Sequence, residues 1–429
     1  MASVPCVVKI PEILLPNDGI DPSKWAVVAC DQFTSEPEYW DGVERLTKNF
    51  PSAYHITYPE IYLGKNQTER VEKINENMKK YLGGGIFKTV KGFVLVERET
   101  KYSKARFGLV ISVDLEAYDF KPFNKAYIKA TEGTILERLP VRIGIRENAS
   151  LELPHILLLA DDEKKAIIEP IAERRGELEK LYDFDLMKDG GHIRGYLVGA
   201  DAAKDIAEKI YSLLDKDAQT EKYGSAEVNF FFAVGDGNHS LATAKACWER
   251  LKTGLSEKER ENHPARYALA ELVNLYDDAL KFEPIHRAVF NADGDFLEGL
   301  KKIEGEGRIK VLKGGKEFET VKEGVNVVSD GGMEFEIGVN KNSAEAIGEI
   351  QGYIEEYLRK NPRTAVDYIH GEEHLRAVIK GGGYGILMPK IEKNELFPYV
   401  VNRGVLPKKA FSMGEAEEKR YYLEAKLIK

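Results

Sequence analysis

The sequence predicts a mixed α and β fold with a smaller C-terminal region, and three observations lead to this expectation. The chain has 429 residues, which is enough for two or three domains of ordinary size. Apolar runs of strand length alternate with amphipathic helical stretches as far as residue 293. Beyond it, short alternating strands are separated by glycine turns, which is typical of an antiparallel meander. We therefore expect a main mixed α/β domain over residues 1–293 and a C-terminal α+β region over residues 294–429.

The composition argues against several classes of protein. The 62 Lys and Arg residues are scattered among 71 Asp and Glu residues, and the net charge is −9. The sequence therefore shows no cluster of basic residues of the kind that binds nucleic acid. The three cysteines are too few and too far apart for a disulfide framework or a structural zinc site. No apolar run reaches the roughly 18 residues of a membrane-spanning helix. We expect a cytoplasmic protein with a small-molecule partner and with neither nucleic acid nor a membrane as partner; the sequence leaves the oligomeric state open.

In the first half of the chain, glycines, prolines and acidic residues mark the ends of the predicted elements. The expected elements are a strand over 25–30 that ends at Asp31, a helix over 66–82, strands over 92–98 and 106–114, a loop and then a helix over 128–145, a strand over 153–160 and a helix over 163–181. The alternation of strands and helices is what predicts the mixed fold of this region.

The second half continues this alternation and then changes to antiparallel strands. The expected elements are a strand over 195–198, a helix over 200–214, a strand and helix within 228–251, an extended piece over 282–290, meander strands over 308–315, 316–324, 325–332 and 333–339, a helix over 344–360 and a strand over 384–388. The run ARYALAELVNL fits both strand and helix periods, and we favour a strand because it follows Pro264.

The most informative stretch is VNFFFAVGDGNHSLATAKACWERL, at residues 228–251. An apolar strand breaks at Gly235-Asp236-Gly237-Asn238-His239-Ser240 and resumes as an amphipathic helix. Asp236 and His239 therefore lie at a helix N-terminus, where the macrodipole favours anions and keeps an imidazole neutral. Glycines on either side of the aspartate let a ligand approach the backbone. A plain glycine turn with Asp236 or Asn238 as the helix cap fits the same residues, and spacing alone does not decide between the two interpretations.

Two further groups of residues suit an anionic ligand. Glu132 and Thr134 precede a predicted helix on which Arg138 and Arg142 are four residues apart and share one face. The alternative is a capping box, because Thr134 stands three residues before a glutamate. His286 and Arg287 follow a proline in an apolar stretch, where an isolated histidine is more often a hydrogen-bonded core residue.

A third pair of histidines, at 370 and 374, has the spacing of zinc ligands on a helix. Gly371 weakens the start of such a helix, and the glutamate of the HExxH signature is at the wrong position. We therefore predict no metal site among these residues.

Over nearly its whole length the chain resembles the bacterial and archaeal family known as domain of unknown function 1015. The segments that carry the resemblance are SKWAVVACDQFTSEPEYW, IKATEGTILERLPVR, DGNHSLATAK, HPARYALAELVNLYDDAL, FEPIHR and LPKKAFSMGEAEEKRYYLEA. The usual central motif of the family is Asp-Gly-His-His-Arg. Here Asp236, Gly237 and His239 match it, whereas Asn238 and Ser240 replace an imidazole and a guanidinium.

The Asp-Gly-x-His element between a strand and a helix also resembles the motif of the ParB and sulfiredoxin superfamily, which includes nucleotide-binding proteins and kinases of free serine. This resemblance implies a ParB/sulfiredoxin-like core, with phosphate groups at the helix start beside Asp236 and His239, and Glu132 as a candidate base. The serine at position 240 removes the family's arginine, so Arg138, Arg142 or Arg287 would have to replace it at a phosphate.

Two hypotheses follow. The first is a phosphoryl-transfer enzyme, a kinase or a phosphatase, that acts on a small hydroxy metabolite such as serine and uses ADP or ATP with Mg²⁺. Glu132 or His239 would take the hydroxyl proton, Asp236 would position Mg²⁺ or the ligand, and the helix start with Arg142 and Arg287 would stabilise the transferred charge. The alternative is a non-catalytic sensor that binds a nucleotide or phosphometabolite, which the two replaced residues of the central motif favour. A structural partner that docks through the C-terminal meander remains a third interpretation.

Overall fold

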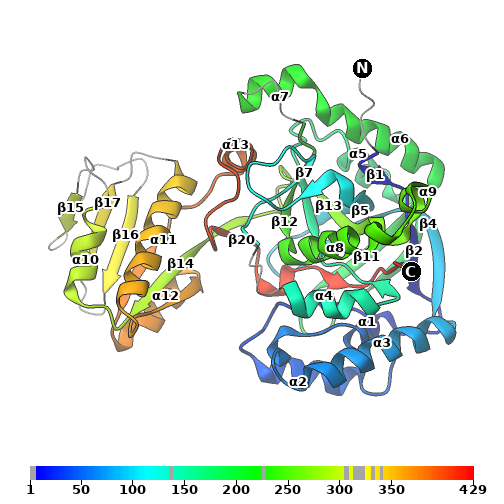
Figure 1. Ribbon diagram of the computed structural model, residues 1–429, viewed down its shortest axis with the longest axis horizontal. Coiled ribbons are helices and arrows are strands. Elements are labelled where there is room, and N and C mark those ends of the chain that lie inside the picture. Colours follow the sequence, from blue (N-terminus) through cyan, green and yellow to red (C-terminus); the bar gives the residue numbers. More distant parts are fainter. Residues whose placement is uncertain are drawn as a thin grey trace. The chain divides into compact units, whose positions relative to one another are not determined.

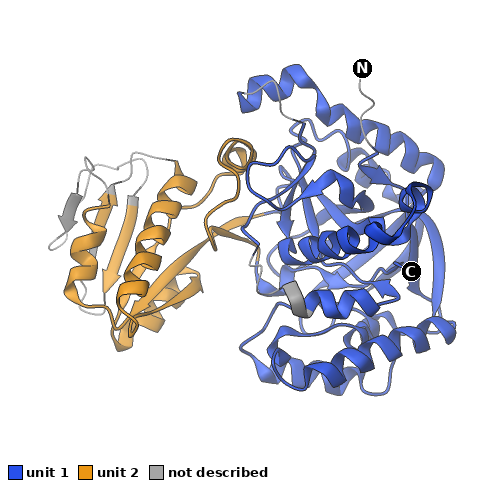
Figure 2. Cartoon of the chain, viewed as in Figure 1, with its two compact units in different colours: residues 1–280, 415–429 blue, residues 281–414 orange. Residues whose placement is uncertain are grey.

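The computed structural model describes residues 6–134, 139–224, 229–303, 309–312, 324–329, 334–338 and 342–429. The chain forms two compact units: residues 1–280 with 415–429 make unit 1, and residues 281–414 make unit 2 (Figure 2). The boundary predicted from the sequence lies after residue 293, with the whole C-terminus in the second region. The division differs because the C-terminal tail pairs with strands of unit 1 and because the strand over 282–290 belongs to the sheet of unit 2.

Unit 1 is built on an eleven-stranded mixed sheet (Figure 1). In order across the sheet the strands are β10 (Glu179–Asp185), β11 (His192–Gly199), β4 (Phe87–Glu99), β5 (Arg106–Asp114), β13 (Tyr267–Asn274), β9 (Leu157–Ala160), β12 (Phe232–Asp236), β7 (Ile128–Ala130) and β6 (Tyr118–Asp119), while β1 (Val8–Lys9) pairs with β5 and β2 (Glu12–Pro16) with β4. β12 runs parallel to β7 and antiparallel to β9, so the sheet is mixed at the strand that leads into the DGNHS motif.

Helices cover both faces of this sheet. They are α1 (Pro22–Trp25), α2 (Pro37–Thr47), α3 (Gln67–Gly83), α4 (Leu139–Asn148), α5 (Glu169–Glu173), α6 (Ala200–Tyr211), α7 (Lys216–Tyr223), α8 (Asn238–Leu251) and α9 (Glu257–Asn262). Side chains of a strand point alternately to opposite faces, and β4 shows this directly. Leu95 packs in one core with Trp248 of α8, whereas its neighbour Val94 packs in a second core with Trp40 of α2 and Ile74 of α3. The central strands are therefore buried on both faces and read as continuous apolar runs.

Short strand pairs fasten the C-terminal tail to unit 1. β21 (Tyr421–Tyr422) pairs with β3 (Val27–Val28), and β22 (Lys426–Leu427) pairs with β8 (Leu151–Glu152). Behind these pairs lies a buried charge network in which the Arg420 guanidinium contacts the carboxylates of Glu271 and Glu424. These contacts fix residues 415–429 next to the N-terminal strands.

Unit 2 contains a seven-stranded sheet in which every strand pair is antiparallel. The order is β15 (Ile309–Leu312), β17 (Glu334–Gly338), β16 (Gly324–Ser329), β19 (Tyr384–Leu387), β14 (Phe282–Phe290) and β18 (Ala365–His370), with β20 (Phe411–Met413) paired to β14. Its helices are α10 (Gly294–Leu300), α11 (Ser343–Lys360), α12 (Glu372–Val378) and α13 (Lys393–Arg403). β15 pairs with β17 rather than with β16, which departs from a sequential meander. Residues 316–323 of the strand predicted over 316–324 lie outside the described residues.

Several predicted elements are confirmed and one is wrong. The helices predicted at 66–82, 200–214 and 344–360 appear as α3, α6 and α11, and the ambiguous run near 270 is the strand β13. The predicted helix over 163–181 is instead the short α5 followed by the seven-residue strand β10, which pairs with β11. Pairing with a neighbouring strand outweighs the local helical period there. In the described residues, each helix is too short or too polar to cross a bilayer.

Candidate functional site

The DGNHS motif forms the junction between β12 and α8. The apolar residues Phe232 to Val234 are buried in the sheet, and the chain turns at Gly237, which has a φ of 79° and caps α8 without a side chain. A Cβ at this position would lie 3.0 Å from the Cα of Ile156, so the turn requires glycine for its conformation and for its packing. Asp236, His239 and Ser240 are only half-buried at this junction. The positive end of α8 therefore faces a partly open surface that carries polar side chains.

Hydrogen bonds tie this junction to the segment that contains Glu132. The Asn238 carboxamide accepts a hydrogen bond from the backbone N–H of Thr131 at 3.2 Å, and the Thr131 hydroxyl donates to the Val234 carbonyl at 2.5 Å. β7 runs parallel to β12 with Ala130 opposite Val234. Glu132 is half-buried and directly follows Thr131, so these hydrogen bonds hold the backbone next to it at the junction.

Asp236 is held by one cation and by its own turn. One of its carboxylate oxygens accepts a hydrogen bond from the Gly237 N–H at 2.8 Å, and the other lies 3.3 Å from the Lys419 ammonium. The exposed fractions of the two side chains are 22% for Asp236 and 12% for Lys419, so the ion pair is accessible from solvent on one side. Lys419 comes from the C-terminal tail of unit 1 and supplies a positive charge beside the helix start.

A second acid and an imidazole lie on the other side of Ser240. The Ser240 hydroxyl is 3.4 Å from Nε2 of His155, and the same nitrogen is 3.6 Å from the Asp31 carboxylate. Nδ1 of His155 lies 2.9 Å from the Tyr422 hydroxyl. The Tyr422 hydroxyl also donates to Cys30 Sγ at 3.0 Å, and Nε2 of His155 faces both Asp31 and Ser240. His155 is 5% exposed, whereas Asp31 is 26% exposed and reaches solvent.

The protonation of these groups follows from their surroundings. Burial alone raises the pKa of the Asp31 carboxyl, but the charge and hydrogen bonding of His155 outweigh it, so the net pKa is well below its usual range. Asp31 is therefore ionised at neutral pH. Burial raises the pKa of the neighbouring Cys30 thiol to about 11, which keeps it protonated and makes it a poor nucleophile.

Arg142 is close to this group but already has a carboxylate partner. It lies on α4, which packs on α8 through Ile143 and Ala242, and its guanidinium contacts the Glu60 carboxylate. Its positive charge also lowers the pKa values of Cys30 and Asp31. Arg142 thus contributes to the electrostatics of the junction.

The other residues that the sequence predicted in unit 1 have different surroundings. Thr134 is half-buried, and its hydroxyl oxygen is a buried polar atom that has no hydrogen-bond partner among the described residues. Gly235 is half-buried and stands between the buried part of β12 and Asp236. Arg138 lies outside the described residues.

In the structure His286 and Arg287 are hydrogen-bonded core residues, an alternative that the sequence left open for the histidine. Both lie on β14 in unit 2. Arg287 is fully buried, and its guanidinium donates to the Gln351 carboxamide at 3.0 Å and to the carbonyls of Lys408 and Lys409 at 2.9 and 3.1 Å. His286 accepts a hydrogen bond from the Met388 N–H. Both side chains already form hydrogen bonds with protein groups, so we do not include them in the proposed site.

The histidines at 370 and 374 lie at the end of β18 and on α12. Across the described ranges, no group of three or more His, Cys, Asp or Glu side chains is arranged to hold a metal ion.

Three side chains of the junction were not predicted as site residues: Asp31, His155 and Lys419. Their sequence signals were weak. Asp31 follows a short apolar run, and Lys419 lies in the late segment LPKKAFSMGEAEEKRYYLEA. Both segments belong to those that carry the family resemblance. His155 follows a proline before an apolar strand, a context that is equally typical of a core histidine.

Comparison with known families agrees with the resemblance seen in the sequence. Residues 14–379 match the family described as protein of unknown function DUF1015. The chain belongs to this family. The DUF1015 match covers the β12–α8 junction, Asp31, Glu132 and His155, but Lys419 lies beyond it. No curated protein is similar enough to the chain to count as a match.

Some solved structures are distantly similar to this DUF1015 chain. A mutant of a free serine kinase in complex with ADP has 14% sequence identity and a TM-score of 0.41, and the alignment covers 75% of this chain and 92% of the kinase. SbnI with a C-terminal truncation, from Staphylococcus aureus, has 11% identity and a TM-score of 0.37 over 72% of this chain and 86% of its own. A conserved hypothetical protein from Pyrococcus furiosus has 14% identity and a TM-score of 0.35 over 73% and 90%. At these TM-scores the likeness is too weak to assign a function.

Proposed function

We propose that unit 1 is a phosphoryl-transfer enzyme that acts on a small hydroxy metabolite such as serine, with ADP or ATP and Mg²⁺ as co-substrate. The observation that carries this proposal is the set of charged groups at the start of α8: Lys419 pairs with Asp236, and Asp31 and Ser240 both contact Nε2 of His155. A helix start beside a lysine attracts phosphate, and two carboxylates suit a Mg²⁺ ion or a reacting hydroxyl. Such a set of groups supports positioning and charge stabilisation, which are the main requirements of phosphoryl transfer.

In the proposed reaction, the phosphate groups of the nucleotide lie at the start of α8 beside Lys419. The oxygen of the acceptor hydroxyl forms a bond to the phosphorus while the bond from phosphorus to the nucleotide's bridging oxygen breaks, and that oxygen leaves with the electron pair. Lys419 and the backbone of α8 stabilise the charge that develops on the phosphoryl and leaving oxygens. Asp236 orients Lys419 and would also be available to the Mg²⁺ of the nucleotide.

The acceptor hydroxyl needs a group that takes its proton. We propose that Asp31 orients this hydroxyl by accepting its hydrogen bond, because it is ionised and partly exposed, while its low pKa makes it a weak base. Glu132 and His239, which the sequence suggested as proton acceptors, are the groups that we propose for the proton. Hydrolysis of a phosphorylated metabolite would use the same groups with water as the phosphoryl acceptor. The proposal therefore includes both the kinase and the phosphatase reaction.

The fold and the cellular location enter here as proposals too. The order strand, glycine turn and helix at β12 and α8 supports a ParB/sulfiredoxin-like core in unit 1. A reaction that consumes ADP or ATP, in a chain with three unpaired cysteines, supports the cytoplasm as its compartment.

The experiment is a phosphoryl-transfer assay of the full chain. ATP or ADP with Mg²⁺ is incubated with a panel of hydroxy metabolites that includes serine, and phosphorylated products are detected by mass spectrometry. For Asp236→Asn and Asp31→Asn we expect kcat/KM to fall by about a hundredfold or more, since each loses a charge that positions a reacting group. Asp201→Asn is the matched control, because this aspartate is 98% exposed on α6. Turnover that is equal in the wild type and both site variants would refute the assignment of the site.

A sensor remains the second candidate, and one contact favours it. Ser240 stands where the family usually has an arginine, and its hydroxyl contacts His155 instead of extending toward a ligand. A sensor would be stabilised by a nucleotide or phosphometabolite without consuming it, so thermal-shift measurements with product analysis separate the two functions. Stabilisation by ADP that Asp236→Asn abolishes, together with no product after long incubation, would favour the sensor.

A further inference from the structure

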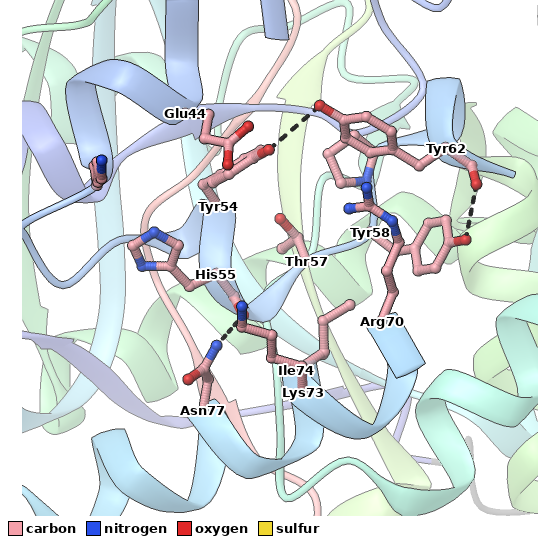
Figure 3. A pocket seen from close by; sticks show the side chains of 12 residues that line it. Glu44, Tyr54, His55, Thr57, Tyr58, Tyr62, Arg70, Lys73, Ile74 and Asn77 are labelled. Carbon is pink, nitrogen blue, oxygen red and sulfur yellow. Dashed lines mark hydrogen bonds between the residues drawn. The ribbon is translucent and has the colours of Figure 1, made fainter. Parts of the chain in front are cut away.

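A separate hollow in unit 1 is lined by residues other than those of the β12–α8 junction. It has a volume of about 270 Å³ and is enclosed by α2, by α3 and by the two 3-10 turns between them, Ala53–Ile56 and Glu60–Tyr62 (Figure 3). The volume suits a small metabolite rather than a polypeptide.

Three tyrosines form one wall of this hollow and are held by contacts with each other. The hydroxyls of Tyr54 and Tyr62 are 3.4 Å apart, and the Tyr58 hydroxyl donates to the backbone carbonyl of Tyr62 at 3.0 Å. Figure 3 shows these side chains around the hollow, with Arg70 extending toward them from α3. The Arg70 guanidinium lies 4.0 Å from the centre of the Tyr62 ring, a cation–π contact that orients it. The wall is therefore ordered before any ligand arrives.

The lining is positively charged in a chain whose net charge is −9. Lys48, Arg70 and Lys73 line the hollow together with a single carboxylate, Glu44. All four side chains are on exposed residues, and none of them forms an ion pair with another described residue. An excess of unneutralised cations at a concave site attracts anions and concentrates them.

Histidine contributes hydrogen bonding rather than charge to this site. Nδ1 of His55 lies 2.9 Å from the Tyr81 hydroxyl, and the Asn77 carboxamide donates to the His55 carbonyl at 3.0 Å. Burial, and then the charge of Lys73, lower the pKa of His55 below its usual value. The imidazole is therefore neutral at pH 7, and the positive charge comes from the lysines and the arginine.

We propose that this hollow is a second ligand site, which binds a small phosphate ester. Arg70 and Lys73 hold the phosphate, because a guanidinium fork and an ammonium match its oxygens. The tyrosine hydroxyls and Asn77 hydrogen-bond to the polar body of the ester. The backbone of Glu60 continues from this wall and donates to the Cys30 carbonyl at 2.8 Å, while its carboxylate contacts Arg142, so the site adjoins the segment that holds the junction.

The experiment measures binding by isothermal titration calorimetry on the full chain, with ribose 5-phosphate as probe and with ribose and inorganic phosphate as its two halves. We expect ribose 5-phosphate to bind at least about tenfold more tightly than ribose, and the affinity to fall as salt rises. Arg70→Ala and Lys73→Ala should each weaken binding by about tenfold, and Arg70→Gln should have the same effect as Arg70→Ala. Lys79→Ala is the matched control, since Lys79 is an exposed residue on the same helix that does not line the hollow.

The variants also separate this site from the proposed phosphoryl-transfer site. Asp236→Asn should leave the binding of ribose 5-phosphate unchanged. The inference is overturned if no probe binds at millimolar concentration, if the Arg70 and Lys73 variants bind like the wild type, or if Asp236→Asn alone removes binding. Failure of the phosphoryl-transfer assay, by contrast, has no bearing on these measurements.

Discussion

The β12–α8 junction of unit 1 and the β14 strand of unit 2 both carry a histidine motif that the sequence marked as a ligand site. Their polar groups are used in opposite ways. On β14, Arg287 is fully buried, and its guanidinium donates hydrogen bonds to Gln351 and to a backbone carbonyl of the protein. At the junction, Asp236 retains 22% of its side-chain exposure and contacts one lysine and its own turn. A motif therefore indicates a ligand site only where the fold leaves the hydrogen-bonding groups of its side chains accessible.

The physical basis of this contrast is the cost of burial. A buried guanidinium is tolerated only when protein groups satisfy it, and once it is satisfied it cannot also hold a phosphate. A half-exposed carboxylate is still solvated, so it can exchange water for a ligand at little cost. Each of the following predictions tests whether the two regions really divide the roles of stability and binding in this way.

The largest effect is expected from Arg287→Ala. The substitution leaves the Gln351 carboxamide and several backbone carbonyls without their donor inside unit 2, so we expect a loss of about 3–5 kcal/mol in the free energy of unfolding. Urea denaturation followed by circular dichroism measures the loss, and hydrogen exchange of the β14 amides localises it to unit 2. Arg359→Ala, an exposed residue on α11, serves as control and should change the stability by less than about 0.5 kcal/mol. Unchanged stability together with lost ligand binding would reverse the roles assigned to the two regions.

The next effect is an acid sensitivity of unit 2 that comes from His286. Burial lowers the pKa of this imidazole to about 4, and its Nδ1 accepts the Met388 N–H, so the folded protein requires the neutral form. The unfolded chain binds a proton below a pH of about 6.5, so the stabilisation is complete above that pH. It is lost as the pH falls from about 6.5 to about 4, by up to about 3 kcal/mol.

The pH dependence is measured by urea denaturation of the wild type and of His286→Asn at several pH values between 7 and 4. The asparagine can accept the same hydrogen bond but does not titrate, so the variant should lose this part of the slope. His374→Asn, at an exposed position on α12, should retain the wild-type slope. If His286→Asn and the wild type show the same slope, His286 does not have the role assigned to it.

The smallest effect on stability is expected at the junction itself. Asp236→Asn keeps an acceptor for the Gly237 N–H and removes only a partly exposed ion pair with Lys419, which should cost less than about 1 kcal/mol. Thermal unfolding of the variant and of the wild type tests this, and the phosphoryl-transfer assay on the same samples tests function. A stability loss as large as that of Arg287→Ala would mean that Asp236 serves the fold, and the contrast between the two regions would disappear.

Local patterns determined a large part of the fold. The helices α3, α6, α8 and α11 have apolar residues at helical spacing, and β13 follows Pro264 as expected, so neighbouring residues were enough to define them. The helix predicted over 163–181 failed because β10 forms by pairing with β11, an interaction that the helical period of a single segment does not reveal. The return of residues 415–429 to unit 1 has the same cause, since β21 pairs with β3 from the opposite end of the chain.

The same division holds for the candidate site. The sequence by itself determined the turn of α8, because a glycine between a strand and a helix and the acid and imidazole beside it form a local signal. Through the family resemblance it also predicted Glu132 as a candidate base. It took the folded chain to reveal that Lys419 contacts Asp236, that Asp31 and Ser240 contact the same nitrogen of His155, and that protein groups bind the guanidinium of Arg287. Charges far apart in the chain interact once the strands have paired, and their spacing in the sequence holds no information about that pairing.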